Sequence, residues 1–275
     1  MNSVTSKDGT KITFDKLGSG PPVILVCGGS VDRMSNAPLA EILSQRFTVY
    51  NYDRRGRGES GDTQPYAEER EIEDIDALVR EAGGQAFLYG SSSGAALALD
   101  ATAAGLNISK LALWEPPYII GDSRPRPPAD TAKIFRDLVA QGRRGDAAEY
   151  FMTKVVGLPP EFAAQARNSP WWPDQEARAH TLAYDATIMG DYSLPTERAA
   201  SVKVPTLVLD GGASFDWIRI TPQALIDILP NGQHRTIEGQ SHDIAAEALA
   251  PVLVEFFLGS QAAPSQSQSA GISPA

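Results

Sequence analysis

Short apolar runs alternate with amphipathic segments along the first 117 residues of the chain. The run PVILVCGG (22–29) is a continuous Val/Ile/Leu stretch that ends in glycine, which is typical of a strand buried on both faces. QAFLYG (85–90) and SKLALWEPP (109–117) have the same character. Helical spacing is found at 66–84, which is acidic and amphipathic, and at 93–105. This order predicts an α/β fold, with a mostly parallel sheet covered by helices on both faces.

The pattern changes between residues 118 and 201, where the chain is punctuated by prolines and has helical spacing without a Val/Ile-rich strand. The earlier alternation resumes at VPTLVLDGG (204–212). We therefore expect a core domain made of residues 1–117 and 202–259, with residues 118–201 inserted as a helical cap. The last stretch, 260–275, is small, polar and aperiodic, and this composition predicts a disordered tail.

The candidate nucleophile lies in the cluster Gly90-Ser91-Ser92-Ser93-Gly94, which follows a predicted strand and precedes a predicted helix. A sharp strand-to-helix turn strains its central residue and needs small neighbours, so G-x-S-x-G in this context indicates a nucleophile elbow. Ser92 would be the nucleophile, and the backbone N–H of Ser93 would face developing negative charge. The alternative is a simple helix start with Ser91 or Ser92 as the N-cap.

Four segments in this order resemble the α/β-hydrolase fold family, and the resemblance extends from about residue 4 to 258. The stretch 8–29 is similar to the family's opening hairpin and third strand, and YDRRGRGES (52–60) to its D-x-R-G-x-G-x-S loop. GSSSG is similar to the nucleophile elbow, and EGQSHD (238–243) to the histidine loop. The resemblance implies an eight-stranded, mostly parallel sheet and the serine hydrolase branch with a helical cap.

The base that would activate the serine is sought among three histidines. His242 follows the last predicted strand in a polar loop, where the family carries its catalytic base. His180 falls in the predicted cap and is expected to be exposed or to pack there. His234 lies in an alternating run and is expected to be a strand residue.

The acid that would orient His242 departs from the usual family pattern. That pattern places an aspartate in the loop after the penultimate strand, where this chain has Ser214, with Asp210 four residues earlier. Glu115 ends the strand after the nucleophile helix, at the position where zearalenone-type lactone hydrolases carry their acid. We favour Glu115 and keep Asp210 as the alternative.

The resemblance also implies an oxyanion hole made by two backbone amides, those of Ser93 and Gly29. Cys27 stands where many family members have histidine. A lone cysteine without a nearby activating group is expected to be buried rather than nucleophilic.

Bulky side chains in the predicted cap and near the last strands are candidates for a substrate pocket: Trp171, Trp172, Met189, Phe215 and Trp217. They favour an apolar ester or lactone as substrate, cleaved through an acyl-serine intermediate. Three alternatives remain: a carbon–carbon bond hydrolase, a polyketide-modifying enzyme with the same triad, or a non-hydrolytic small-molecule binder. The same bulky residues could also simply pack the cap onto the core.

Composition restricts the partners further. The formal net charge of −10 argues against nucleic acid and anionic membrane surfaces as partners. It also disfavours a strongly anionic substrate unless a local basic pocket overrides it. The polar start, the absence of an apolar run of roughly 18 residues and the single cysteine indicate a cytoplasmic protein. No metal or other cofactor is expected, and the oligomeric state is left open.

Overall fold

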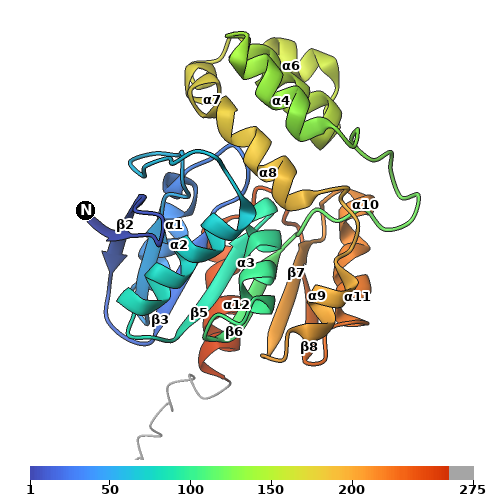
Figure 1. The fold of residues 1–275 in the computed structure, drawn as a ribbon. Coiled ribbons are helices and arrows are strands. Elements are labelled where there is room, and N and C mark those ends of the chain that lie inside the picture. The colour runs from blue at the N-terminus through green and yellow to red at the C-terminus, as the bar shows by residue number, and fades with distance from the viewer. Residues whose placement is uncertain (260–275) are drawn as a thin grey trace, which may run out of the picture.

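The computed structural model describes residues 1–259, and the predicted tail at 260–275 lies outside the described residues (Figure 1). The predicted α/β fold is confirmed, with one eight-stranded sheet in the order β1-β2-β4-β3-β5-β6-β7-β8. Only the pairs β1–β2 and β2–β4 are antiparallel. The strands are β1 (Asn2–Thr5), β2 (Lys11–Leu17), β3 (Pro22–Val26), β4 (Thr48–Tyr52), β5 (Ala86–Ser91), β6 (Ile108–Trp114), β7 (Thr206–Gly211) and β8 (Gly232–Ile237).

Helices cover both faces of the sheet, as the sequence predicts. In β3, Val23 and Leu25 pack into one buried cluster and Ile24 and Val26 into the other, which is why this run is apolar at every position. One face is covered by α1 (Ala37–Leu43), which follows the short η1 (Arg33–Asn36), and by α12 (Ala246–Leu258). The other face is covered by α2 (Glu68–Glu81), α3 (Ser93–Ala103) and α11 (Thr221–Ile226).

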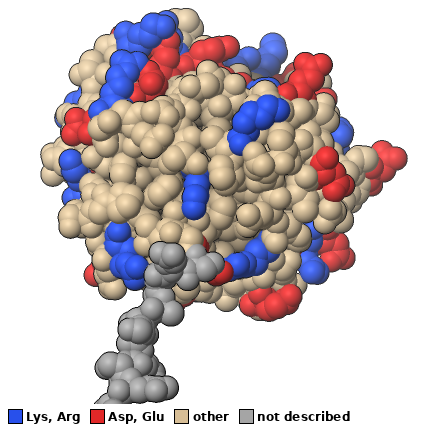
Figure 2. Space-filling view, turned by 90° about the horizontal axis from the view of Figure 1, so that it is seen from below, with Lys and Arg blue, Asp and Glu red and all other residues tan. Residues whose placement is uncertain are grey.

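The segment after β6 forms a layer of helices above the sheet in Figure 1. This layer lies within the predicted cap and is called the cap below; it consists of α4 (Thr131–Ala140), α5 (Arg144–Tyr150), η2 (Phe151–Val156), α6 (Pro160–Ala166), α7 (Trp172–Arg178), η3 (Ala179–Thr181) and α8 (Leu182–Met189). Part of it has a small core of its own, where Trp172 packs with Met152, Ala163 and Ala166. On the opposite side of the molecule, Figure 2 shows positive and negative side chains interspersed among uncharged ones.

The end of the predicted cap, at residue 201, falls in a helix that packs on the core. Helix α9 (Thr196–Ser201) contacts α3 in the core, and Arg198 Nη1 lies 3.0 Å from an oxygen of Asp100. The last residues of the predicted cap are therefore held against α3. A short helix, α10 (Asp216–Arg219), follows β7.

Asp100 is a buried carboxyl group at the junction of α2, α3 and α9. Burial and the nearby carboxyl of Glu68 raise the pKa of Asp100 to about 8, although Arg198 opposes the shift. Because the ordinary value is about 4, the folded protein binds a proton that the unfolded chain releases. This carboxyl therefore makes the fold less stable as the pH rises from about 4 to about 8.

We expect Asp100→Asn, which mimics the protonated carboxyl, to stabilise the protein more at alkaline than at acidic pH. The difference in the free energy of unfolding between variant and wild type should grow by about 1–3 kcal/mol from pH 6 to pH 9. Urea unfolding at both pH values measures it. The exposed carboxylate Asp137, replaced by Asn, is the control and should show no such growth. A pH-independent effect of Asp100→Asn would contradict the assignment.

Candidate active site

Ser92 lies in a strained turn between β5 and α3. Its φ of 54° and ψ of −125° are unfavourable for a residue with a side chain, at a cost of about 1–3 kcal/mol. A Cβ at Gly90 would lie 2.3 Å from the carbonyl oxygen of Gly94, and one at Gly94 would lie 2.3 Å from that of Cys27. Both flanking positions therefore require glycine, for the steric reason that the sequence motif indicates.

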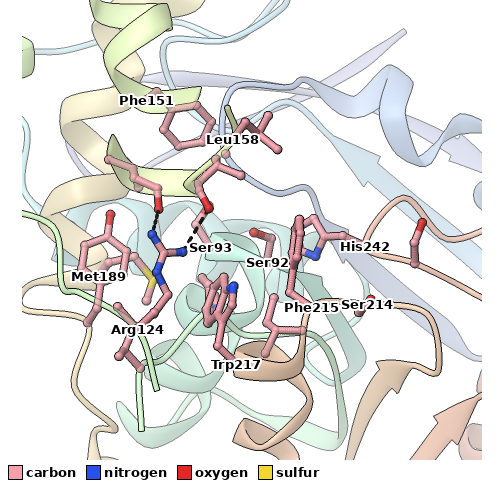
Figure 3. Close-up of a pocket in the computed structure, with 18 of the residues that line it drawn as sticks. Ser92, Ser93, Arg124, Phe151, Leu158, Met189, Ser214, Phe215, Trp217 and His242 are labelled. Atoms are coloured by element: carbon pink, nitrogen blue, oxygen red, sulfur yellow. Dashed lines mark hydrogen bonds between the residues drawn. The ribbon is translucent and has the colours of Figure 1, made fainter. Parts of the chain in front are cut away.

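The alternative of a simple N-cap does not describe this turn. Ser92 precedes α3, but its side chain makes no capping hydrogen bond, and Ser91 belongs to β5. The Ser92 side chain instead lines a cavity between the sheet and the cap (Figure 3).

His242 lies in the loop between β8 and α12 and lines the same cavity as Ser92. The indole Nε1 of the fully buried Trp114 donates a 3.0 Å hydrogen bond to the His242 carbonyl, which positions the loop. The imidazole Nδ1 lies 2.6 Å from Oε2 of Glu115. The other ring nitrogen, Nε2, is thus left for a substrate or nucleophile.

Glu115 is completely buried at the carboxyl end of β6, with a positive φ of 44°. Its second oxygen, Oε1, accepts a 2.7 Å hydrogen bond from the backbone N–H of Gly211. Each carboxylate oxygen therefore accepts one hydrogen bond, from Gly211 and from His242. This arrangement suits an ionised carboxylate that orients an imidazole.

Asp210, the alternative acid, has different partners. Its Oδ1 lies 2.8 Å from His234 Nε2 and accepts a 2.8 Å bond from the hydroxyl of Thr236, both on β8. Its Oδ2 lies 3.6 Å from Arg219. The structure thus brings Glu115, and not Asp210, to His242, and it places His234 in a strand.

The two residues expected to supply the amides of the oxyanion hole line the same cavity as Ser92. Gly29 and Ser93 line the cavity, and a Cβ at Gly28 would lie 3.2 Å from the Ser92 Cβ, so the loop after β3 packs directly on the elbow. Cys27 is fully buried, and burial raises the pKa of its thiol. It therefore has the environment of a packing residue rather than a nucleophile.

A buried ionic cluster, formed by Arg54, Arg57 and Asp185, supports this loop and was not anticipated from the sequence. Asp185 in α8 accepts a 2.9 Å bond from Arg54 and bonds of 2.8 and 2.9 Å from Arg57. Burial alone would raise the pKa of Asp185, but the two guanidinium groups and the Ser93 hydroxyl lower it below its ordinary value. The carboxylate is therefore ionised.

The same arginines hold the backbone next to the expected oxyanion hole. Arg57 donates to the carbonyl of Gly28, and Arg54 Nη1 lies 3.4 Å from that of Cys27. The Ser93 hydroxyl donates a 2.8 Å bond to Asp185. The ionic cluster thus joins the loop after β3, the elbow and the cap. Asp185 follows Arg54 by 131 residues, so only the arginine-rich loop was visible as a local pattern.

Two adjoining cavities meet at Ser92 and His242. The larger has a volume of about 490 Å³ and the smaller about 390 Å³. In the view of Figure 3, His242 and Phe215 lie on one side of the larger cavity and Met189 on the other. Trp217 also lines it. The space at the candidate nucleophile is therefore divided into two parts with mostly apolar walls.

Two of the predicted pocket residues, Trp171 and Trp172, are not among the residues that line these two cavities. Trp172 begins α7 and is buried inside the cap, where the guanidinium of Arg167 lies 5.4 Å from its ring centre. Trp171 is on the surface and 41% exposed. Neither tryptophan packs in the clusters of the core, so the alternative, in which these residues join the cap to the core, does not describe this pair either.

Residues 23–253 match a family model described as the alpha/beta hydrolase family. The chain belongs to this family. An α/β hydrolase from Sphaerobacter thermophilus is 57% identical, with a TM-score of 0.88 over 93% of this chain and all of that one. A thermophilic esterase from Thermogutta terrifontis shares the fold at 24% identity, with a TM-score of 0.72 over 94% of this chain and 97% of that one.

A curated relative, the uncharacterized hydrolase YraK of Bacillus subtilis, is 34% identical over 103 residues. This match covers 36% of the chain and 38% of the relative, so it spans well under half of that protein. Within residues 1–259, no helix has the length and apolar character needed to cross a membrane. The same residues contain no group of three or more His, Cys, Asp or Glu side chains placed to hold a metal ion.

We expect Glu115→Gln to lower the hydrolytic turnover of this α/β hydrolase by about 10³–10⁴-fold. Both oxygens of Glu115 accept hydrogen bonds, from Gly211 and from His242. The NH2 group of a glutamine would therefore face one of these two donors, and that hydrogen bond would be lost. Asp210→Asn should retain most of the turnover. The kcat values are compared in proteins of equal melting temperature. A larger loss from Asp210→Asn would overturn the choice of acid.

We expect Asp185→Asn to lower the free energy of unfolding by about 3–5 kcal/mol, because Arg54 and Arg57 would lose their shared carboxylate in a buried site. Asp146→Asn is the matched control, since Asp146 pairs with two arginines at the surface and should contribute about 1 kcal/mol or less. Urea denaturation measures both. Equal effects would show that the ionic cluster has no special structural role.

Proposed function

We propose that this protein is a serine hydrolase that cleaves a carboxylic ester or lactone with a largely apolar body. One observation carries the proposal: Ser92, in a strained elbow, shares a cavity with His242, whose Nδ1 lies 2.6 Å from the buried Glu115. This set of groups contains a nucleophile, a base and an acid that orients the base.

In the proposed reaction, His242 Nε2 accepts the Ser92 proton while the hydroxyl oxygen attacks the substrate carbonyl carbon. The amides of Gly29 and Ser93 stabilise the oxyanion of the tetrahedral intermediate. The carbonyl re-forms, the bond to the leaving alkoxide breaks, and His242 protonates that alkoxide. Water, deprotonated by His242, then attacks the acyl carbon; the bond to Ser92 Oγ breaks, His242 returns the proton to that oxygen, and the acid is released. Glu115, hydrogen-bonded to Nδ1, orients the ring and stabilises the imidazolium.

The two cavities support a substrate with two arms, one on each side of the scissile bond. They share Ser92 and His242 in their walls, so the acyl part and the alcohol part of an ester can occupy different spaces. Apolar side chains such as Met189 and Trp217 suit an apolar body. The name of the Thermogutta relative, an esterase, is in keeping with this class.

A lactone is the second form of the same substrate class. The acid position at Glu115 resembles that of zearalenone-type lactone hydrolases, which is an analogy and not a property of the cavity. Carbon–carbon bond hydrolysis or polyketide modification by the same triad would appear as activity on a diketone with poor ester turnover. A non-hydrolytic binder would hold a ligand without turnover.

We expect wild type to hydrolyse para-nitrophenyl butyrate and Ser92→Ala to lose nearly all of this activity, because the attacking oxygen is removed. Ser91→Ala is the matched control and should keep most of it. An organophosphonate should label wild type at Ser92, as mass spectrometry of peptides would show. Turnover that survives in Ser92→Ala, or that is lost equally in Ser91→Ala at unchanged stability, would contradict the assignment.

A further inference from the structure

The larger cavity contains an arginine, Arg124, in an otherwise mostly apolar wall (Figure 3). Its guanidinium lies 4.5 Å from the ring centre of Trp217, a distance at which a cation is attracted to an aromatic face. Burial lowers the pKa of Arg124, but an arginine remains charged at neutral pH. The cavity that adjoins Ser92 therefore has a fixed positive charge.

Arg124 has no carboxylate partner among residues 1–259. This contrasts with Arg54, Arg55 and Arg57, each of which is buried and paired with acidic side chains. Asp185 also lines the cavity, but its carboxylate is already paired with Arg54 and Arg57. A partly buried cation that lacks an anion is costly unless a ligand supplies one.

Hydrogen bonds within the protein use only some of the N–H groups of the Arg124 guanidinium. Its two Nη atoms donate to the carbonyls of Val155 and Val156, at 2.9 and 3.0 Å, at the end of η2. Gly157 follows with a φ of 90°, and a Cβ there would lie 3.3 Å from Nη2. These bonds use two of the five N–H groups of an arginine. The other three have no acceptor in the described part of the chain.

A second polar group lines the cavity at Tyr192. Burial raises the pKa of its phenol above the ordinary value, so the hydroxyl is protonated and can donate a hydrogen bond. Arg124 is among the charges that act on this phenol. The wall of the cavity thus contains the phenol Tyr192 in addition to the fixed charge of Arg124.

We propose that Arg124 binds a carboxylate of the substrate, remote from the scissile carbonyl, so that the enzyme prefers esters or lactones that carry a free carboxylate on an otherwise apolar body. This inference rests on the proposed function, since it names the substrate of the Ser92 site. A charge-assisted bond to a carboxylate in an apolar cavity adds both affinity and orientation. The net negative charge of the chain does not oppose this preference, because the charge next to the substrate is local.

The test compares two para-nitrophenyl esters with the same scissile bond. One is the monoester of adipic acid, and the other is its neutral isostere, in which an acetyl group replaces the carboxylate. Monoesters of glutaric and pimelic acids extend the series, because the length of the linker sets where the carboxylate falls. The kcat/KM ratio of anionic to neutral ester is measured for wild type, Arg124→Met and Arg124→Lys.

Arg126→Met is the matched control. Arg126 lies two residues along the same segment and is exposed, and its guanidinium donates to the carbonyls of Asp191 and Ile119. It does not line the cavity. Both Met variants remove one positive charge, so long-range electrostatic effects are equal in the two.

We expect Arg124→Met to lower the kcat/KM ratio of anionic to neutral ester by about 10–100-fold for at least one diacid in the series. The loss should come mainly from a higher KM for the anionic ester. Arg124→Lys should retain part of the preference, and Arg126→Met should leave the ratio unchanged. Equal losses on both esters in Arg124→Met, or a wild type without preference, would overturn the inference while leaving the proposed function intact. Failure of wild type to hydrolyse either ester would instead count against the proposed function and, with it, the inference.

Discussion

The buried contact of Asp185 with Arg54 and Arg57 joins the three parts of the molecule that must meet around the candidate nucleophile. Asp185 comes from the cap and the arginines from the loop after β4, and their guanidinium groups reach the backbone of the loop after β3. Burying charges this completely is costly unless they are paired, and both guanidinium groups pair with Asp185. The cap is therefore tied to the sheet directly beside Ser92.

Two of the four non-glycine residues with a positive φ in residues 1–259 lie at the carboxyl ends of two neighbouring strands. Ser92 ends the turn after β5 and Glu115 follows β6, and both have positive φ. The backbone N–H of Ser92 donates to the carbonyl of Trp114, so the two strained residues are held by one adjacent pair of strands. Parallel strands bring such ends together at one edge of the sheet, where ligands bind in open α/β folds. This explains how a nucleophile and an acid 23 positions apart in the chain reach the same histidine.

The chemistry of the cavity combines apolar walls with one local charge. Met189 and Trp217 favour an apolar body, whereas Arg124 adds a cation that the described part of the chain does not neutralise. Net charge describes the field far from the surface, but a ligand in a confined cavity interacts mainly with groups a few ångströms away. An acidic protein and a carboxylate-bearing substrate are therefore compatible.

The sequence by itself determined the α/β architecture, the elbow around Ser92 and the loop that carries His242, because these depend on local periodicity and on glycines at fixed spacing. It indicated the roles of His242 and Glu115 only through a resemblance to a known family. Tertiary structure decided what depends on distant contacts: that Glu115 reaches His242, that Asp185 meets Arg54, and that the two tryptophans at 171 and 172 stay within the cap. Side chains more than a hundred residues apart have no common local pattern, so only packing brings them together.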